Sequence, residues 1–135
     1  MHQIYVDEGL IEILIRLASG DITFGLFTND VTPDRDTVMA DLTLAAWAGY
    51  TSVPLTGGDF PNSNIIGHQA RIWGPGEPFN NFSGVDQVAY GYYLSDNSET
   101  MLFVVSRFDD APVTIPDGGQ LILQQQLGNF SRYST

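Results

Sequence analysis

The sequence of 135 residues contains no cysteine, no lysine and no long apolar run. Without cysteine, disulfides, thiolate metal sites and a catalytic thiol are excluded, and the redox compartment cannot be read from the sequence. The most apolar window, 9–18, contains Glu12 and Arg16 and is shorter than the roughly 18 apolar residues of a membrane-spanning helix. The same window has neither the basic start nor the cleavage site of a signal peptide. We therefore expect neither a membrane-spanning helix nor a signal peptide. The length is that of one domain with a sizeable core.

Positive charge is scarce. Five arginines stand against sixteen aspartates and glutamates, and the formal net charge is −11. Nucleic-acid binding depends on cationic contacts to phosphates, so we expect no nucleic-acid partner, and the same reasoning applies to anionic membranes. The acidity favours solubility and opposes non-specific self-association, or it matches a basic surface on a specific partner.

The segment 7–19 is predicted to be the one α-helix. Asp7 can cap its N-terminus, and Gly20 follows where a left-handed C-cap is needed. One broad face is apolar and must be covered, either by the chain's own sheet or by another subunit. That face comprises Leu10, Ile11, Leu14, Leu17 and Ala18. Residues 1–6 are expected to form an N-terminal arm that is ordered on binding.

From residue 22 onward, apolar segments alternate with turns rich in glycine, proline, asparagine and aspartate. This alternation predicts an all-β fold, an antiparallel jelly-roll-like sandwich of about eight strands. We expect a single domain over 7–127, followed by a C-terminal tail over 128–135. A helical turn is expected within 37–40, a turn-rich loop at 57–64 and a strand break at 74–78. The expected strands are 22–28, 50–55, 67–73, 79–83, 86–96, 100–108, 111–115 and 118–127.

Candidate catalytic and metal-binding residues form no recognised pattern. His2 and His68 are the only histidines, their spacing matches no zinc motif, and no G-x-S-x-G elbow is present. A hydrolase would need His68 or two close carboxylates in a cleft. Three acidic segments could supply oxygens to calcium, although turn formation explains the same residues: 29–36, 95–99 and 108–110. We predict no catalytic residue, no metal and no cofactor.

Several aromatic residues admit two interpretations. Exposed in a groove they would stack on sugars, and buried they would fill the core of the sandwich. Core packing is the interpretation that we prefer for this set: Trp47, Trp73, Tyr90, Tyr92 and Tyr93. The two N-x-S sequences, 81–83 and 129–131, are short enough to arise by chance, and we base nothing on them.

Several motifs, spread over nearly the whole chain, resemble those of a known group of proteins. They are Leu26 to Pro33, then Asp41, Thr43, Ala45, Gly49 and Tyr50, then Tyr90 to Tyr92, and finally Arg107, Phe108, Pro112, Val113 and Gly118. In this order they resemble small virion structural proteins of tailed bacteriophages. The matching residues are of the kinds that form turns and pack in the core. The resemblance therefore bears on the fold more directly than on the function. In Leu26–Pro33 we expect Asn29 and Asp30 to make Asx-type turns and Pro33 to end the pairing of a core strand.

The resemblance implies a non-enzymatic particle component. The expected function is that of a capsid decoration (cement) protein, made in the bacterial host cytoplasm and located on the capsid surface of the virion. Its expected partners are the major capsid protein and further copies of itself in a trimer. The alternative is a tail or tail-fibre module that binds a host receptor or glycan. The residues expected at the capsid or subunit interface are His2, Gln3, Ile4, Tyr5, Leu10, Leu14 and Leu17.

Overall fold

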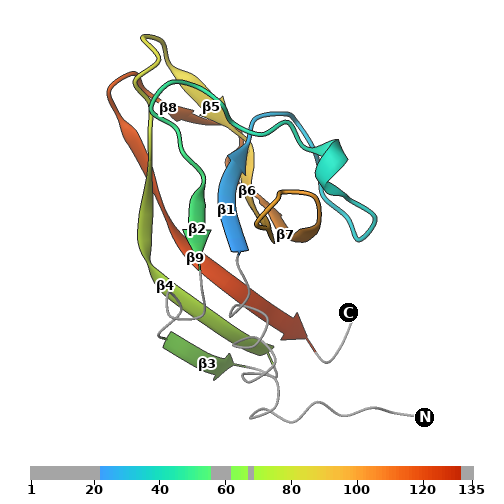
Figure 1. The fold of residues 1–135 in the computed structure, drawn as a ribbon. Helices are drawn as coiled ribbons and strands as arrows, with labels where there is room; N and C mark the ends of the chain where they lie inside the picture. The colour runs from blue at the N-terminus through green and yellow to red at the C-terminus, as the bar shows by residue number, and fades with distance from the viewer. Residues whose placement is uncertain (1–21, 56–61, 67–68, 132–135) are drawn as a thin grey trace, which may run out of the picture. The chain divides into compact units, whose positions relative to one another are not determined.

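The computed structural model describes residues 22–55, 62–66 and 69–131 (Figure 1). Contacts between residues group the chain into two units, and the single domain over 7–127 expected from the sequence stays a prediction. One unit, which we call the core unit, comprises Ile22–Pro54 and Glu77–Leu123. The predicted arm 1–6 and the predicted helix 7–19 lie outside the described residues.

The regular structure of the described residues consists of strands apart from one short helical turn, which confirms the all-β class. The one helical element among them is the 3-10 turn η1 (Met39–Asp41), which overlaps the turn expected within 37–40. No helix in this described part has the length and apolar character needed to cross a bilayer. The strands are β1 (Ile22–Phe27), β2 (Val53–Leu55), β3 (Asn62–Ile66), β4 (Gln69–Asn80), β5 (Gln87–Ala89), β6 (Gly91–Asp96), β7 (Leu102–Arg107), β8 (Val113–Ile115) and β9 (Gln120–Ser131).

The centre of the core unit is a sheet with strand order β2-β1-β6-β7 (Figure 1). Strands β1 and β6 pair antiparallel, from Ile22 opposite Asp96 to Phe27 opposite Gly91. All residues of β1 are buried, because both faces of the sheet are covered at this strand. Burying each of its large apolar side chains contributes about 1.5–3 kcal/mol, so β1 explains a substantial part of the stability.

Two smaller sheets complete the described fold. Strands β5 and β8 pair antiparallel within the core unit, with Val88 opposite Thr114. The third sheet has the order β3-β4-β9, and β3 pairs antiparallel with β4 from Asn62 opposite Trp73 to Ile66 opposite Gln69.

The predicted strand 86–96 is two strands. The chain leaves the β5–β8 pair at Tyr90 and enters the four-stranded sheet at Gly91, so β5 and β6 belong to different sheets. The change of sheet requires glycine, because a Cβ on residue 91 would lie 2.0 Å from the carbonyl oxygen of Ser106 and 2.6 Å from the Phe27 ring. In β6 the neighbours Tyr93 and Leu94 are both fully buried.

The predicted break at 74–78 is also wrong, because β4 runs through it without interruption. Its pairing with β3 ends at Trp73, so Pro75 and Pro78 lie in the part of β4 that extends beyond β3. A proline there removes no hydrogen bond to that strand, which is the situation in which strands tolerate proline. Two further boundaries differ: β3 begins inside the predicted loop 57–64, and β9 continues into the predicted tail 128–135.

Different side chains cover the two faces of the central sheet. On one face the Phe24 ring makes edge contacts with Phe79 and Tyr92, at ring-centroid distances of 5.2 and 5.6 Å. On the other, Phe27 and Tyr93 pack with Met39 and Leu42 from the segment around η1. The long connection 28–52 therefore acts as a cover for the sheet.

Substituting Gly91 with alanine should destabilise the fold more than the same change at Gly84. Overpacking at Gly91 should lower the free energy of unfolding by about 3 kcal/mol, since backbone and an aromatic ring must both move. Gly84 has open space around it and φ +88°, so Gly84→Ala should cost only about 1 kcal/mol of left-handed strain. Urea unfolding of both variants measures the difference, and equal losses would contradict the role given to Gly91.

Candidate functional site

The interface residues predicted from the sequence fall outside the described part of the chain. They are His2, Gln3, Ile4, Tyr5, Leu10, Leu14 and Leu17, and their assignment remains a prediction. His68 also lies outside the described residues. The remaining candidates, the acidic segments, most of the aromatic residues and the turn after β1, lie in the core unit.

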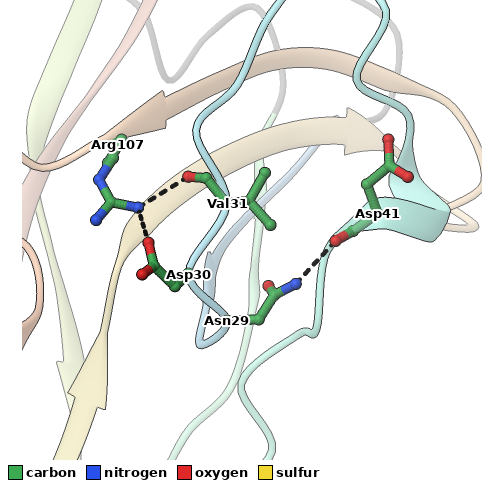
Figure 2. A network of polar contacts seen from close by, with 5 residues as sticks. All are labelled: Asn29, Asp30, Val31, Asp41 and Arg107. Carbon is green, nitrogen blue, oxygen red and sulfur yellow. Dashed lines mark hydrogen bonds and ion pairs between the residues drawn. The ribbon is translucent and has the colours of Figure 1, made fainter.

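The turn after β1 ties the sheet to its cover (Figure 2). The Asn29 side chain donates from Nδ2 to the carbonyl oxygen of Asp41 at 2.8 Å and accepts from the Thr43 amide at 2.8 Å. The Thr28 amide adds a bond to the carbonyl oxygen of Thr43. Instead of an Asx turn, Asn29 thus makes a long-range clamp between residues 29 and 41–43.

Arg107 at the end of β7 holds the same turn from the other side (Figure 2). Its Nη1 donates to the Asp30 carboxylate and, at 3.0 Å, to the carbonyl oxygen of Val31. The guanidinium lies 5.4 Å from the centre of the Tyr90 ring, within range of a cation–π interaction. Asp30 is well exposed, so the ion pair itself contributes only about 0–1 kcal/mol. These contacts position the turn and leave Asp30 paired.

The acidic segment 95–99 is a hairpin loop organised around Asp96. One carboxylate oxygen accepts from the amides of Thr100 and Met101 at 2.7 and 2.8 Å. The other accepts from the hydroxyls of Thr100 and Ser98 at 2.7 and 2.9 Å. The Met101 amide, the Thr100 hydroxyl and the other donors favour the charged form and hold the pKa of Asp96 well below its ordinary value of 3.8. Both carboxylate oxygens of Asp96 are therefore already occupied by donors from the protein.

The other acidic segments are used in the same local way. In 29–36 the Asp34 carboxylate accepts from the Asp36 amide at 2.8 Å, which is an Asx turn. In 108–110 both aspartates are exposed. Among the residues that the structure describes, no three His, Asp or Glu side chains converge on one point that could hold a metal.

Most of the aromatic residues pack against one another. Trp47 contacts Tyr50, Tyr50 stacks on Phe79 with ring centroids 5.8 Å apart, and Phe79 leads through Phe24 to Tyr92. The Trp47 indole also donates to the carbonyl oxygen of Asn80 at 2.8 Å. These rings form a connected series in the core unit, in which Trp47 and Tyr92 are half-buried. Tyr93, another residue of the set for which we preferred core packing, is fully buried.

The strongest candidate for chemistry is a group of two tyrosines and one glutamate beside β1. The hydroxyls of Tyr50 and Tyr93 both lie against Gly25, whose absent Cβ would meet them at 2.6 and 2.4 Å. Tyr50 accepts from the Leu26 amide at 3.0 Å, and Tyr93 donates to the Glu99 carboxylate at 2.5 Å. Glu99 has φ +56°, so the hairpin holds it in the left-handed region that a residue with a side chain seldom adopts.

The protonation of this group limits what it can do. Burial raises the pKa of Tyr50, and burial together with the hydrogen bond to Glu99 raises the pKa of Tyr93 further. Both phenols therefore keep their protons at neutral pH and cannot serve as general bases. Their hydroxyls are already bonded to the Leu26 amide and to Glu99, so the arrangement stabilises the strand and the hairpin.

One important side chain escaped the sequence analysis. Asn81 is fully buried, and its Nδ2 donates to the carbonyl oxygens of Val85 and Ile115 at 2.8 and 2.9 Å. Its Oδ1 accepts from the amide and hydroxyl of Ser83 at 3.0 and 2.7 Å. The signal in the sequence was the N-x-S motif at 81–83, whose serine is here a hydrogen-bonding partner of the asparagine.

Replacing Asp96 with asparagine should make the free energy of unfolding less dependent on pH in the acidic range. The stabilisation from Asp96 is complete above its unfolded pKa and is lost as the pH falls toward the lower folded value. Asp96→Asn should therefore lower the free energy of unfolding at pH 7, and the deficit should shrink below about pH 4. Urea unfolding from pH 7 to 3 measures this, with Asp109→Asn as a control for loss of one exposed charge. A deficit that stays constant with pH would refute it.

The bond between Tyr93 and Glu99 should appear as a coupling energy. Tyr93→Phe should lower the free energy of unfolding by about 1.5–3 kcal/mol, as expected for a hydrogen bond to a charged acceptor. Glu99→Asn suits the left-handed backbone but is too short to reach the phenol. In that background Tyr93→Phe should cost at least about 1 kcal/mol less, and additive losses in the double-mutant cycle would show that the two side chains act independently.

Comparisons of the chain with known proteins were made at three levels. No protein-family model, no curated protein and no solved structure matches it. The function is therefore inferred from the residues of the chain, their geometry and the motif resemblance described above.

Proposed function

We propose that the chain is a non-enzymatic structural protein of a tailed-bacteriophage virion, a capsid decoration protein that binds the major capsid protein and stabilises the head. We also propose the finer features of its fold: a jelly-roll-like sandwich, a helix over 7–19 and assembly into homotrimers. In this proposal the arm 1–6 and the apolar face of the helix supply contacts to the capsid or between subunits.

The observation that carries the proposal is the use of polar side chains in the core unit. Asn29, Asn81 and Arg107 each bond to residues distant in the sequence, and Asp96 organises a hairpin. A cement protein must be a rigid body, because a flexible one could not resist movement between capsid subunits. Side chains of the types that elsewhere perform chemistry are here committed to holding loops in place.

The packing of the aromatic rings favours this function over glycan binding. A sugar-binding surface requires rings that face solvent side by side. Here Tyr50 and Phe79 stack within the core unit, the Trp47 indole is bonded to Asn80, and Tyr90 lies beneath Arg107. The net charge of −11 supports solubility before assembly.

Immunogold electron microscopy of virions from the phage that encodes this chain tests the proposal. Antibody raised against the purified chain should place gold over the heads, at many positions on each particle. The same antibody adsorbed beforehand with the purified chain is the control and should leave the particles unlabelled. Gold at the tail or its tip would overturn the decoration proposal in favour of a tail module, and unlabelled particles would exclude an exposed virion protein.

A further inference from the structure

Two loops of the core unit are bound to each other and present apolar side chains to solvent. The Trp47 indole donates to the carbonyl oxygen of Asn80 at 2.8 Å, and the Phe82 amide donates to that of Ala48 at 2.8 Å. A further bond, from the Tyr50 amide to the carbonyl oxygen of Trp47, closes the first loop. The loops 47–50 and 81–86 therefore form one continuous surface.

Hydrogen bonds to the rest of the core unit hold the loop 81–86 in place. Buried Asn81 bonds to Val85, to Ser83 and, across the unit, to Ile115. From the side, Asp117 accepts the Gly84 amide at 2.9 Å, and its own amide donates to Asp86 at 3.1 Å. Little conformational freedom remains for this loop to lose when it binds a partner, which favours affinity.

The apolar side chains on this surface are large and exposed. Phe82 is 62% exposed and Val85 is 61% exposed. Gly49 has φ +91° and lies against the Phe82 ring, where a Cβ would come within 2.5 Å of Cδ2. We call the exposed residues Ala48, Gly49, Phe82 and Val85 the Phe82 patch. Single exposed apolar residues are common, but an aromatic ring on a preorganised loop is of the type enriched in interface cores, and a valine exposed on the same loop adds apolar area.

Charge beside the patch indicates the kind of partner. Asp86 and Asp117 are both exposed, and each uses only Oδ1 in the loop bonds described above. A second copy of this chain docked patch to patch would bring the same carboxylates against them, and over the whole chain sixteen acidic residues outnumber five arginines. The complementary partner is a different protein with an apolar hollow bordered by arginine or lysine.

We propose that the Phe82 patch is the surface that docks on the capsid shell, with Phe82 and Val85 in an apolar hollow and Asp86 and Asp117 beside basic residues of the major capsid protein. This inference rests on the proposed function, since it assigns the binding surface of the decoration protein. It adds a contact site within the described core unit to the terminal segments predicted from the sequence.

Binding to particles purified from a phage deletion strain that lacks this chain tests the docking surface. Phe82→Ser and Val85→Ser should each weaken binding about tenfold or more, because each removes an apolar side chain that the hollow would bury. Met101→Ser is the matched control, since Met101 is also apolar and 61% exposed but lies on the β6–β7 hairpin. Its affinity should stay within about twofold of the natural chain, and circular dichroism and thermal unfolding check that all variants are folded.

The charged rim is tested separately by Asp86→Asn and Asp117→Asn. Both substitutions keep the Oδ1 acceptor that the loop requires and remove the charge. They should slow association several-fold at low salt and flatten its dependence on salt concentration.

The outcomes separate the two proposals. If the natural chain fails to bind the particles, the decoration function is wrong and the docking surface falls with it. If the natural chain binds and Phe82→Ser binds equally well, the decoration function stands and the docking surface is overturned. Equal losses from Phe82→Ser and Met101→Ser would also overturn it, because the effect would then not be local to the patch.

Discussion

The complete burial of β1 is the constraint on which the rest of the described core depends. A strand covered on both faces must place every side chain and must satisfy every backbone group without water. Strand β6 bonds to one edge of β1. The other edge is shared between β2, the bridge from Phe27 to Leu44 and the hydroxyl of Tyr50, which accepts a hydrogen bond from the Leu26 amide. The Tyr50 hydroxyl thus meets a need of β1 that the neighbouring strand does not.

The same constraint explains two glycines and the long connection after β1. Tyr93 crosses β1 at Gly25, and the Phe27 ring occupies the space beside Gly91, so a side chain at either position would collide with a core ring. The face that carries Phe27 and Tyr93 then needs a cover, which Met39 and Leu42 supply. Asn29 and Arg107 fix that cover to the sheet (Figure 2). Packing in the core therefore determines where the polar clamps lie.

Local chemistry predicted much of this fold from the sequence. The apolar run at 22–28, the turn around Met39–Asp41 and the all-β class follow from patterns that act within a few residues. The sequence analysis failed where the decisive partner is distant. The split at Gly91 depends on Ser106 and Phe27, and the continuity of β4 through its prolines depends on where β3 ends. The role of Asn81 depends on Ile115, and the exposure of Phe82 could not be distinguished from core burial by residue type alone.

Residue type and residue use also diverge at the candidate sites. Asp96, Glu99 and Tyr93 are side chains that elsewhere bind metals or move protons, and Arg107 is one that elsewhere binds anions. Each is already committed to a bond within the chain. The loop at 81–86 shows the opposite combination, since its polar groups make it rigid while its apolar groups remain free of contacts that would bury them. Burying an exposed phenylalanine side chain yields about 1.5–3 kcal/mol, and within the described core that gain is left unused at Phe82. A docking element requires both a rigid backbone and exposed apolar surface, and the loop 81–86 has both. This loop is therefore a stronger candidate for function than the acidic segments.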